Sequence, residues 1–177
     1  LGGEFFDYFE STGGEFAFAL GDISGKGPSA ALLASSVLAI LATGPHTANP
    51  GVALDAPNRA MLRRAVPGKF ATVVFASLSK DGRLTYSNAG HNPPLLLGRK
   101  GPKWLKTRGM FVVMFEQAQF EEETLQLEAG DRLVVYSDGI TEARNTEDDE
   151  FGDQRLLSCV EANRTQAPAD LVKSILE

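Results

Sequence analysis

The sequence predicts an α+β fold in which two antiparallel sheets are flanked by helices. Helical patterns occupy both ends of the 177-residue chain, and a run of short β-rich segments lies between them. Tight turns rather than helices join these segments, which favours antiparallel pairing over alternating βαβ units. Hydrophobic residues make up 43% of the chain and charged residues 23%, the balance of an ordinary globular protein. The length favours one domain, so we assign residues 1–177 to a single one.

The first elements are a strand and two helices. Glu15–Asp22 alternates loosely between apolar and other residues and ends in a glycine-rich turn, which predicts a strand. Pro28–Thr43 predicts a helix, because proline suits the first turn and the apolar residues that follow recur every 3.6 positions. Pro57–Val66 predicts a second helix, with apolar residues on one face and arginines on the other.

From residue 69 the pattern changes to short strands. Phe70–Ser77 is apolar and β-branched, and Asp81-Gly82 predicts a hairpin turn into Leu84–Ser87. Further strands are expected at Pro93–Leu97, Lys103–Leu105, Glu121–Leu127 and Leu133–Tyr136. Two C-terminal helices are expected at Gln154–Glu161 and Pro168–Leu176.

The net charge of −6 argues against binding to nucleic acid or to an anionic membrane surface. The same charge repels a phosphorylated substrate, so a phosphate site needs a local positive charge, and bound cations are the obvious source.

The most apolar run, Ala30–Thr43, is too short to cross a bilayer, which predicts no membrane insertion. Cys159 is the only cysteine, so no intrachain disulfide is possible, which fits a cytoplasmic location. We interpret it as a core residue.

Three acidic residues lie beside glycines at predicted turns, namely Glu4, Asp22 and Asp138. Asp22 and Asp138 each end an apolar strand, and the neighbouring glycines allow a ligand to approach the backbone closely. Carboxylates far apart in sequence could therefore converge on a site for a hard cation. The alternative for each is a turn-forming acid, since Asp and Gly are common in turns.

A phosphate-binding P-loop, a zinc site and a catalytic histidine fit the sequence less well. Gly21–Gly27 is not a phosphate-binding P-loop, because its glycine spacing is too short and no Ser or Thr follows Lys26. The chain has only two histidines, His46 and His91, and no His/Cys cluster of the zinc type. His91 lies in a turn, where a hydrogen-bonded structural histidine is the expected interpretation.

Five motifs in order carry a resemblance that is far more specific than any one of them. They are Gly2–Asp7, Gly21–Gly27, Asn88–Pro94, Tyr136–Ala143 and Phe151–Gly152. Together they resemble the bacterial PPM (PP2C-like) protein serine/threonine phosphatases of the SpoIIE/RsbU type, over nearly the whole chain.

The resemblance implies the α-β-β-α sandwich of PP2C and a centre of two Mn²⁺ or Mg²⁺ ions that activates a water. It implies that Asp22 bridges the two metals, that the carbonyl of Ile23 binds one of them, and that Asp138 binds the other. Glu4 occupies a metal-ligand position where the family usually carries Asp. Gly109–Phe115 replaces a family segment with a Pro-Leu-Gly core, so a local change of loop is expected there.

The resemblance further implies a phosphorylated protein substrate, typically an anti-sigma-factor antagonist of the STAS type, and an N-terminal sensory or receiver domain in the full-length protein. The family's last metal-binding Asp lies in a strand after the final helix, so we expect the 177 residues to be truncated at both ends. Two alternatives stay open: a pseudophosphatase that acts as a binding or regulatory module, and an unrelated metal-dependent hydrolase.

Overall fold

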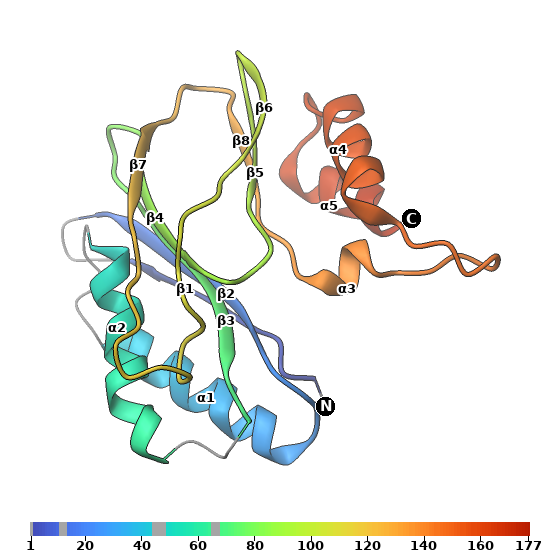
Figure 1. The fold of residues 1–177 in the computed structure, drawn as a ribbon. Coiled ribbons are helices and arrows are strands. Elements are labelled where there is room, and N and C mark those ends of the chain that lie inside the picture. The colour runs from blue at the N-terminus through green and yellow to red at the C-terminus, as the bar shows by residue number, and fades with distance from the viewer. Residues whose placement is uncertain (1, 11–13, 44–48, 65–67) are drawn as a thin grey trace. The chain divides into compact units, whose positions relative to one another are not determined.

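The computed structural model describes residues 2–10, 14–43, 49–64 and 68–177 (Figure 1). It consists of two compact units, of which the first comprises residues 1–91 and 106–127 and the second residues 92–105 and 128–177. Each unit contains one antiparallel sheet and its own helices. The predicted α+β class with two antiparallel sheets is therefore confirmed.

The first unit contains a five-stranded sheet in the order β1-β2-β3-β4-β7. Its strands are β1 (Phe5–Glu10), β2 (Phe16–Ile23), β3 (Ala71–Leu78), β4 (Arg83–Ala89) and β7 (Glu123–Gln126). Its helices are α1 (Pro28–Thr43), α2 (Pro50–Met61) and the 3-10 turn η1 (Leu62–Arg64). Helix α1 lies against β1 and β2, and α2 lies against β3 and β4 (Figure 1).

The core of this unit lies between the sheet and its two helices. Along β2 the buried residues alternate with more accessible ones, because successive side chains of a strand point to opposite faces. Ala17, Ala19 and Ile23 belong to the core together with residues of both helices, such as Val37 and Leu54. Asp22 therefore projects from the other face of the sheet, away from the helices.

The second unit contains a three-stranded sheet in the order β6-β5-β8. Its strands are β5 (Leu95–Gly98), β6 (Gly101–Trp104) and β8 (Arg132–Val134). Its helices are α3 (Asp138–Thr141), α4 (Gly152–Ala162) and α5 (Pro168–Leu176). Leu95, Leu97, Leu156, Val160 and Leu171 form its buried core.

The predicted helices and strands need correction in two respects. The helix expected at Pro57–Val66 begins earlier, at Pro50, and Pro57 lies inside it. Either proline can start a helix, because the first turn needs no N–H donor there, and the structure uses the earlier one. Residues 65–67 lie outside the described residues, so the predicted end of that helix is not described. Strand β1 was not predicted at all.

Within the described residues, no helix is both long enough and apolar enough to cross a membrane. Cys159 is half-buried, and its thiol donates to the carbonyl of Ser174 across a distance of 3.3 Å. This contact joins α4 to α5, but Cys159 is not part of the buried core, so its interpretation as a core residue needs correction.

Candidate metal centre

Glu4 and Asp22 come together at the end of the β1–β2 pair. The register pairs Phe5 with Gly21, so the next residues outward on the two strands are Glu4 and Asp22. The amide of Ile23 donates to the carbonyl of Gly3 at 3.2 Å, which shows that the antiparallel register continues past Glu4. Residues directly opposite in such a pair share a face, with Cβ atoms about 5 Å apart. Like charges in these positions repel each other, and a cation between them would relieve that repulsion.

Gly3 leaves room for the carboxylate of Asp22 and the carbonyl oxygen of Ile23. A Cβ atom on Gly3 would lie 2.5 Å from the carbonyl oxygen of Ile23 and 2.9 Å from Oδ1 of Asp22. Both oxygens therefore border the same small volume beside the Gly3 backbone, which only glycine leaves open. A carboxylate and a carbonyl are donors that Mg²⁺ and Mn²⁺ accept, so the residues present fit a hard cation.

The turn after Ile23 is fixed by the start of β3. The amide of Ser24 donates to the carbonyl of Phe70 at 2.9 Å, and the amide of Phe70 donates to Oγ of Ser24 at 3.0 Å. The ammonium of Lys69 donates to the carbonyl of Ser24 at 2.6 Å. Gly25 has φ of 83°, a left-handed conformation that favours glycine. The Lys69 ammonium is thus bound to the residue that lies two positions after Asp22.

A polar network supports Asp22 from the neighbouring strand. Thr72 is paired with Asp22 across β2 and β3, and its hydroxyl lies 3.4 Å from the Asp22 carbonyl oxygen. The same hydroxyl lies 3.0 Å from Nδ1 of His91. His91 is buried, its amide donates to Oδ1 of Asn88 at 2.7 Å, and its carbonyl accepts from Nδ2 of Asn88 at 3.0 Å. The prediction of a hydrogen-bonded structural histidine is confirmed.

Asp138 belongs to the second unit, where it begins the four-residue helix α3. Its carbonyl accepts from the amide of Glu142 at 2.7 Å, and its side chain is exposed. Just before it, the hydroxyl of Tyr136 donates to Asp153 at 3.0 Å. Burial and this hydrogen bond raise the pKa of Tyr136, so the phenol stays neutral and anchors the segment that leads to Asp138.

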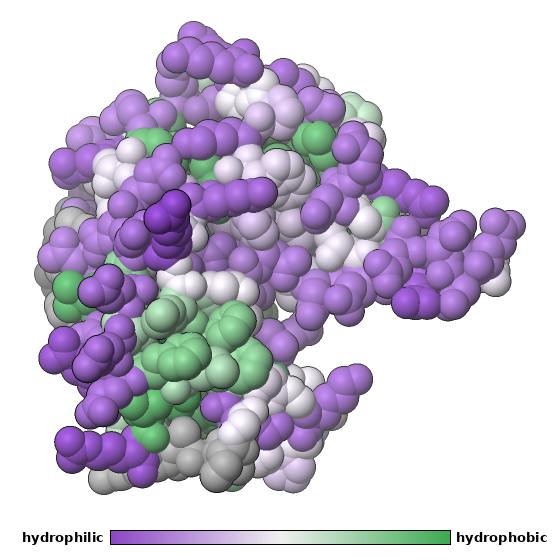
Figure 2. All heavy atoms as spheres, viewed as in Figure 1, coloured by the Kyte–Doolittle hydropathy of each residue, from purple (hydrophilic) through white to green (hydrophobic). Residues whose placement is uncertain are grey.

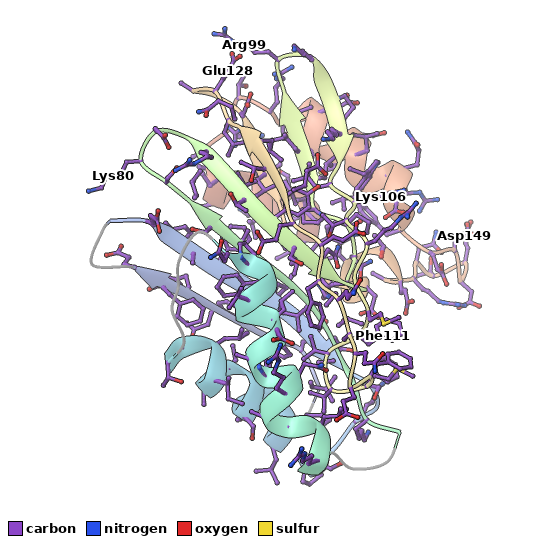
Figure 3. All side chains as sticks on the ribbon, turned by 60° about the vertical axis from the view of Figure 1, so that its left-hand side comes forward. Lys80, Arg99, Lys106, Phe111, Glu128 and Asp149 are labelled. Atoms are coloured by element: carbon purple, nitrogen blue, oxygen red, sulfur yellow. The ribbon has the colours of Figure 1, made fainter. Side chains whose placement is uncertain are left out.

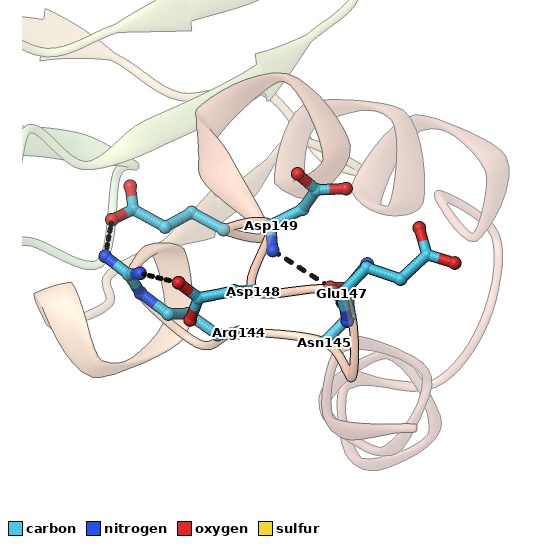
Figure 4. Close-up of polar contacts among 6 residues, drawn as sticks. Arg144, Asn145, Glu147, Asp148 and Asp149 are labelled. Carbon is cyan, nitrogen blue, oxygen red and sulfur yellow. Dashed lines mark hydrogen bonds and ion pairs between the residues drawn. The ribbon is translucent and has the colours of Figure 1, made fainter.

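The acidic run after α3 forms a separate, self-contained loop (Figure 4). Arg144 binds the carboxylates of Asp148 and Glu150 at 2.9 and 3.0 Å, and these contacts raise the pKa of its guanidinium. Oδ1 of Asn145 accepts from the amides of Glu147 and Asp149, each at 2.9 Å. This arrangement is that of a turn held together by its own side chains.

The structure thus joins three of the four predicted ligands, Glu4, Asp22 and Ile23, within one unit. The fourth, Asp138, is described within the other unit. Among the residues that the structure describes, no group of three or more His, Cys, Asp or Glu is close enough to hold a metal ion. Sequence reasoning missed the roles of Lys69 and Thr72, which only the pairing of β2 with β3 brings beside Asp22.

Comparison with known proteins decides the family. The family model described as Stage II sporulation protein E (SpoIIE) matches residues 12–177. The chain belongs to the SpoIIE family.

Two relatives of this SpoIIE-family chain are named proteins. It is 28% identical to the phosphoserine phosphatase RsbU of Bacillus subtilis over 163 residues, which cover 90% of this chain and 48% of RsbU. It is 38% identical to protein IcfG of Synechocystis sp. over 96 residues, which cover 53% of this chain and 15% of IcfG. The chain thus spans about half the length of RsbU and a smaller part of IcfG.

Solved structures show the same fold. The PP2C domain of SiaA from Pseudomonas aeruginosa matches with a TM-score of 0.83 and 16% identity, over 99% of this chain and 72% of that one. The RsbU and RsbW domains of Rv1364c from Mycobacterium tuberculosis match with a TM-score of 0.78 and 25% identity, over 100% of this chain and 50% of that one. The SpoIIE-family chain has the predicted PP2C-type fold.

Structures with this fold have been solved with metal ions. RsbX in complex with magnesium matches with a TM-score of 0.75 and 16% identity, over 99% of this chain and 79% of that one. The catalytic domain of the serine/threonine phosphatase PstP in complex with two manganese ions matches with a TM-score of 0.69 and 15% identity, over 99% of this chain and 85% of that one.

Proposed function

We propose that this chain contributes the metal-binding part of a protein serine/threonine phosphatase, which hydrolyses phosphoserine or phosphothreonine on a regulatory protein. The observation that carries the proposal is the convergence of the Asp22 carboxylate and the Ile23 carbonyl beside Gly3, with Glu4 opposite Asp22. Membership of the SpoIIE family and the likeness to RsbU support the same reaction.

In this proposal Glu4, Asp22, Ile23 and Asp138 hold two divalent cations, Mn²⁺ or Mg²⁺. Such cations, when bound, lower the pKa of a water and polarise phosphoryl oxygens. Asp22 and Glu4 concentrate negative charge at one strand end, Gly3 keeps the approach open, and Thr72 restrains the Asp22 backbone. In this reaction a water that the cations activate is the nucleophile.

The proposal also covers the substrate and the full-length protein. A phosphorylated anti-sigma-factor antagonist of the STAS type is the partner we propose, supported by the match to a structure that contains RsbU and RsbW domains. We also propose that the full-length protein is cytoplasmic and carries an N-terminal sensory or receiver domain.

A second candidate function is that of a pseudophosphatase, which binds partners without turnover. It is favoured by the exposed Glu4, which stands where the family usually carries Asp, and by the lack of a three-residue ligand cluster among the described residues. Hydrolysis of p-nitrophenyl phosphate with and without Mn²⁺ separates the two functions, because a pseudophosphatase gives no metal-dependent turnover.

The test of the site itself is Asp22→Ala in the intact protein, compared with Asp55→Ala as a matched control. Asp55 is an acidic residue of the same unit that forms an i,i+4 pair with Arg59 on α2. We expect Asp22→Ala to abolish Mn²⁺-dependent hydrolysis while the circular dichroism spectrum stays unchanged, and Asp55→Ala to retain the activity. Full activity in Asp22→Ala would refute the proposed centre.

A further inference from the structure

Large apolar side chains gather on the surface of the first unit along the segment Gly109–Phe115. Met110, Met114 and Phe115 are 48%, 44% and 43% exposed. Figure 2 shows a hydrophobic area over this segment, which precedes β7, with hydrophilic residues around it. Exposed apolar patches with a polar rim are typical of interaction sites. We call Phe70, Met110, Phe111, Met114 and Phe115 the apolar patch.

The backbone under the apolar patch is firmly anchored. Ala71 and Val112 exchange two backbone hydrogen bonds of 2.9 Å, and both residues are fully buried. The side chain of Asn58, which is also fully buried, accepts from the amide of Val113 at 2.7 Å and donates to the carbonyl of Phe115 at 3.0 Å. The exposed side chains are therefore displayed by a fixed backbone and not by a loose loop.

One residue of this segment is strained. Val113 has φ of 65°, a left-handed conformation that is a true outlier for a β-branched residue, and its side chain is 2% exposed. Such strain persists only where the surroundings over-determine it, and it is concentrated at functional sites. The strained Val113 points inward while its neighbour Met114 lies at the surface.

The apolar patch lies next to the turn of the candidate metal centre. The rings of Phe70 and Phe111 stack with centroids 4.6 Å apart. The carbonyl of Phe70 accepts from the amide of Ser24, two residues after Asp22. From Met110 to Phe115 the chain extends over at most about 18 Å, so the whole patch is near this turn. A peptide bound at the turn would reach it within a few residues.

Charged residues of both signs border the apolar patch. Lys69 directly precedes Phe70, Glu116 directly follows Phe115, and the amide of Glu121 donates to the carbonyl of Arg108 at 3.1 Å. Figure 3 shows Lys106 and Phe111 on the same segment of the first unit. The chain as a whole has a net charge of −6. An apolar patch beside the proposed cation site complements a segment that carries a phosphate and apolar residues close together.

We propose that the apolar patch docks the apolar residues that flank the phosphorylated residue of a protein substrate. This proposal rests on the proposed function, and it adds the chemistry by which a substrate is selected. Methionine side chains are flexible and polarisable, so they adapt to differently shaped apolar partners. The stacked Phe70 and Phe111 provide a rigid base beside them.

The experiment uses two phosphoserine peptides of equal length and charge, one with Leu and one with Ser at the flanking positions. The intact protein is assayed with Mn²⁺, and the ratio of kcat/KM for the two peptides is the readout. We expect the Leu peptide to be preferred about tenfold, the lower end of the discrimination that an apolar pocket gives. The double variant M110Q/M114Q should bring the ratio close to one.

The matched control is Leu32→Gln, which changes an apolar side chain of α1 that is 70% exposed and lies outside the apolar patch. We expect it to keep the preference for the Leu peptide. A ratio near one in the wild-type protein, or an unchanged ratio in M110Q/M114Q, would overturn the proposal. A wild-type dimer that M110Q/M114Q dissociates would also overturn it, because the patch would then join two copies of the chain.

Binding without turnover separates this proposal from the proposed function. Fluorescence anisotropy of the labelled peptides is measured with Asp22→Ala and with the triple variant D22A/M110Q/M114Q. Tighter binding of the Leu peptide to Asp22→Ala, lost in the triple variant, supports the docking surface even if the wild-type protein shows no hydrolysis. Equal binding of both peptides to Asp22→Ala counts against the docking surface whatever the activity.

Discussion

Gly3→Ala tests whether the open space beside Asp22 and Ile23 matters for metal binding. The added Cβ would lie 2.5 Å from the Ile23 carbonyl oxygen, about 0.5 Å inside the limit of 3.0 Å that real Cβ atoms essentially never cross. That oxygen belongs to the backbone, so no side-chain rotation removes the clash. Gly2→Ala is the matched control, because its Cβ would meet only the Glu4 amide nitrogen at 3.8 Å, an ordinary contact.

The clash forces β1 away from the end of β2 or shifts the carboxylate of Asp22. Overpacking of this kind costs about 1–3 kcal/mol of folding free energy. For a chain of this size each kcal/mol lowers Tm by about 2–4 °C, so the expected decrease is about 2–12 °C. Because the added methyl group occupies the volume that both oxygens border, Mn²⁺ affinity should fall by about tenfold or more, the cost of misplacing a ligand.

Calorimetric titration with Mn²⁺ and thermal unfolding followed by circular dichroism measure the two effects. Gly2→Ala should match the wild-type protein in both. If Gly3→Ala binds Mn²⁺ as tightly as Gly2→Ala does, the space beside Gly3 is not part of the metal centre. A lower Tm with unchanged Mn²⁺ affinity would show that Gly3 is needed only for packing.

Three further outcomes are expected. Glu4→Asp should bind Mn²⁺ more tightly in calorimetric titration, because the shorter carboxylate restores the family's usual ligand; equal or weaker affinity would contradict this. Asn58→Ala should lower the unfolding free energy by about 1–3 kcal/mol in urea, because it leaves the buried amide of Val113 without its acceptor; a smaller loss would show that water replaces the side chain. Burial raises the pKa of Tyr86 and Tyr136 above the usual 10.0, so the folded protein keeps protons that the unfolded chain releases, and stability should fall as pH rises above about 10. Urea unfolding at several pH values should show a shallower decline in the Phe variants of these tyrosines, and an equal decline would contradict the assignment.

Much of the fold could be predicted from local patterns. The helix at Pro28–Thr43 matches α1 at both ends, because a first-turn proline and a long 3.6-residue apolar period mark it clearly. The Asp81-Gly82 turn and its two strands were predicted because the turn chemistry is local. Strand β1 was missed, since its pattern of aromatic residues is short and was interpreted only as part of a motif.

The site was less predictable, because its geometry comes from pairing between distant segments. The glycines beside Glu4 and Asp22 drew attention to a region in which the structure pairs these two residues, but glycine at a turn does not reveal which atoms it makes room for. Only the register of β1 with β2 shows that Gly3 leaves space for Asp22 and Ile23. No local pattern indicates the role of Lys69, because its hydrogen bond to the Ser24 carbonyl joins residues 45 positions apart.

The start of β3 connects the two proposals physically. Phe70 bonds through its backbone to Ser24 and stacks through its ring on Phe111, so one residue of the apolar patch is also bonded to the metal turn. Any shift of that strand end would therefore change the metal turn and the docking surface together. Substitutions at Phe70 should accordingly alter Mn²⁺ affinity and peptide preference in parallel, whereas M110Q/M114Q, which changes side chains outside the metal turn, should alter the preference alone.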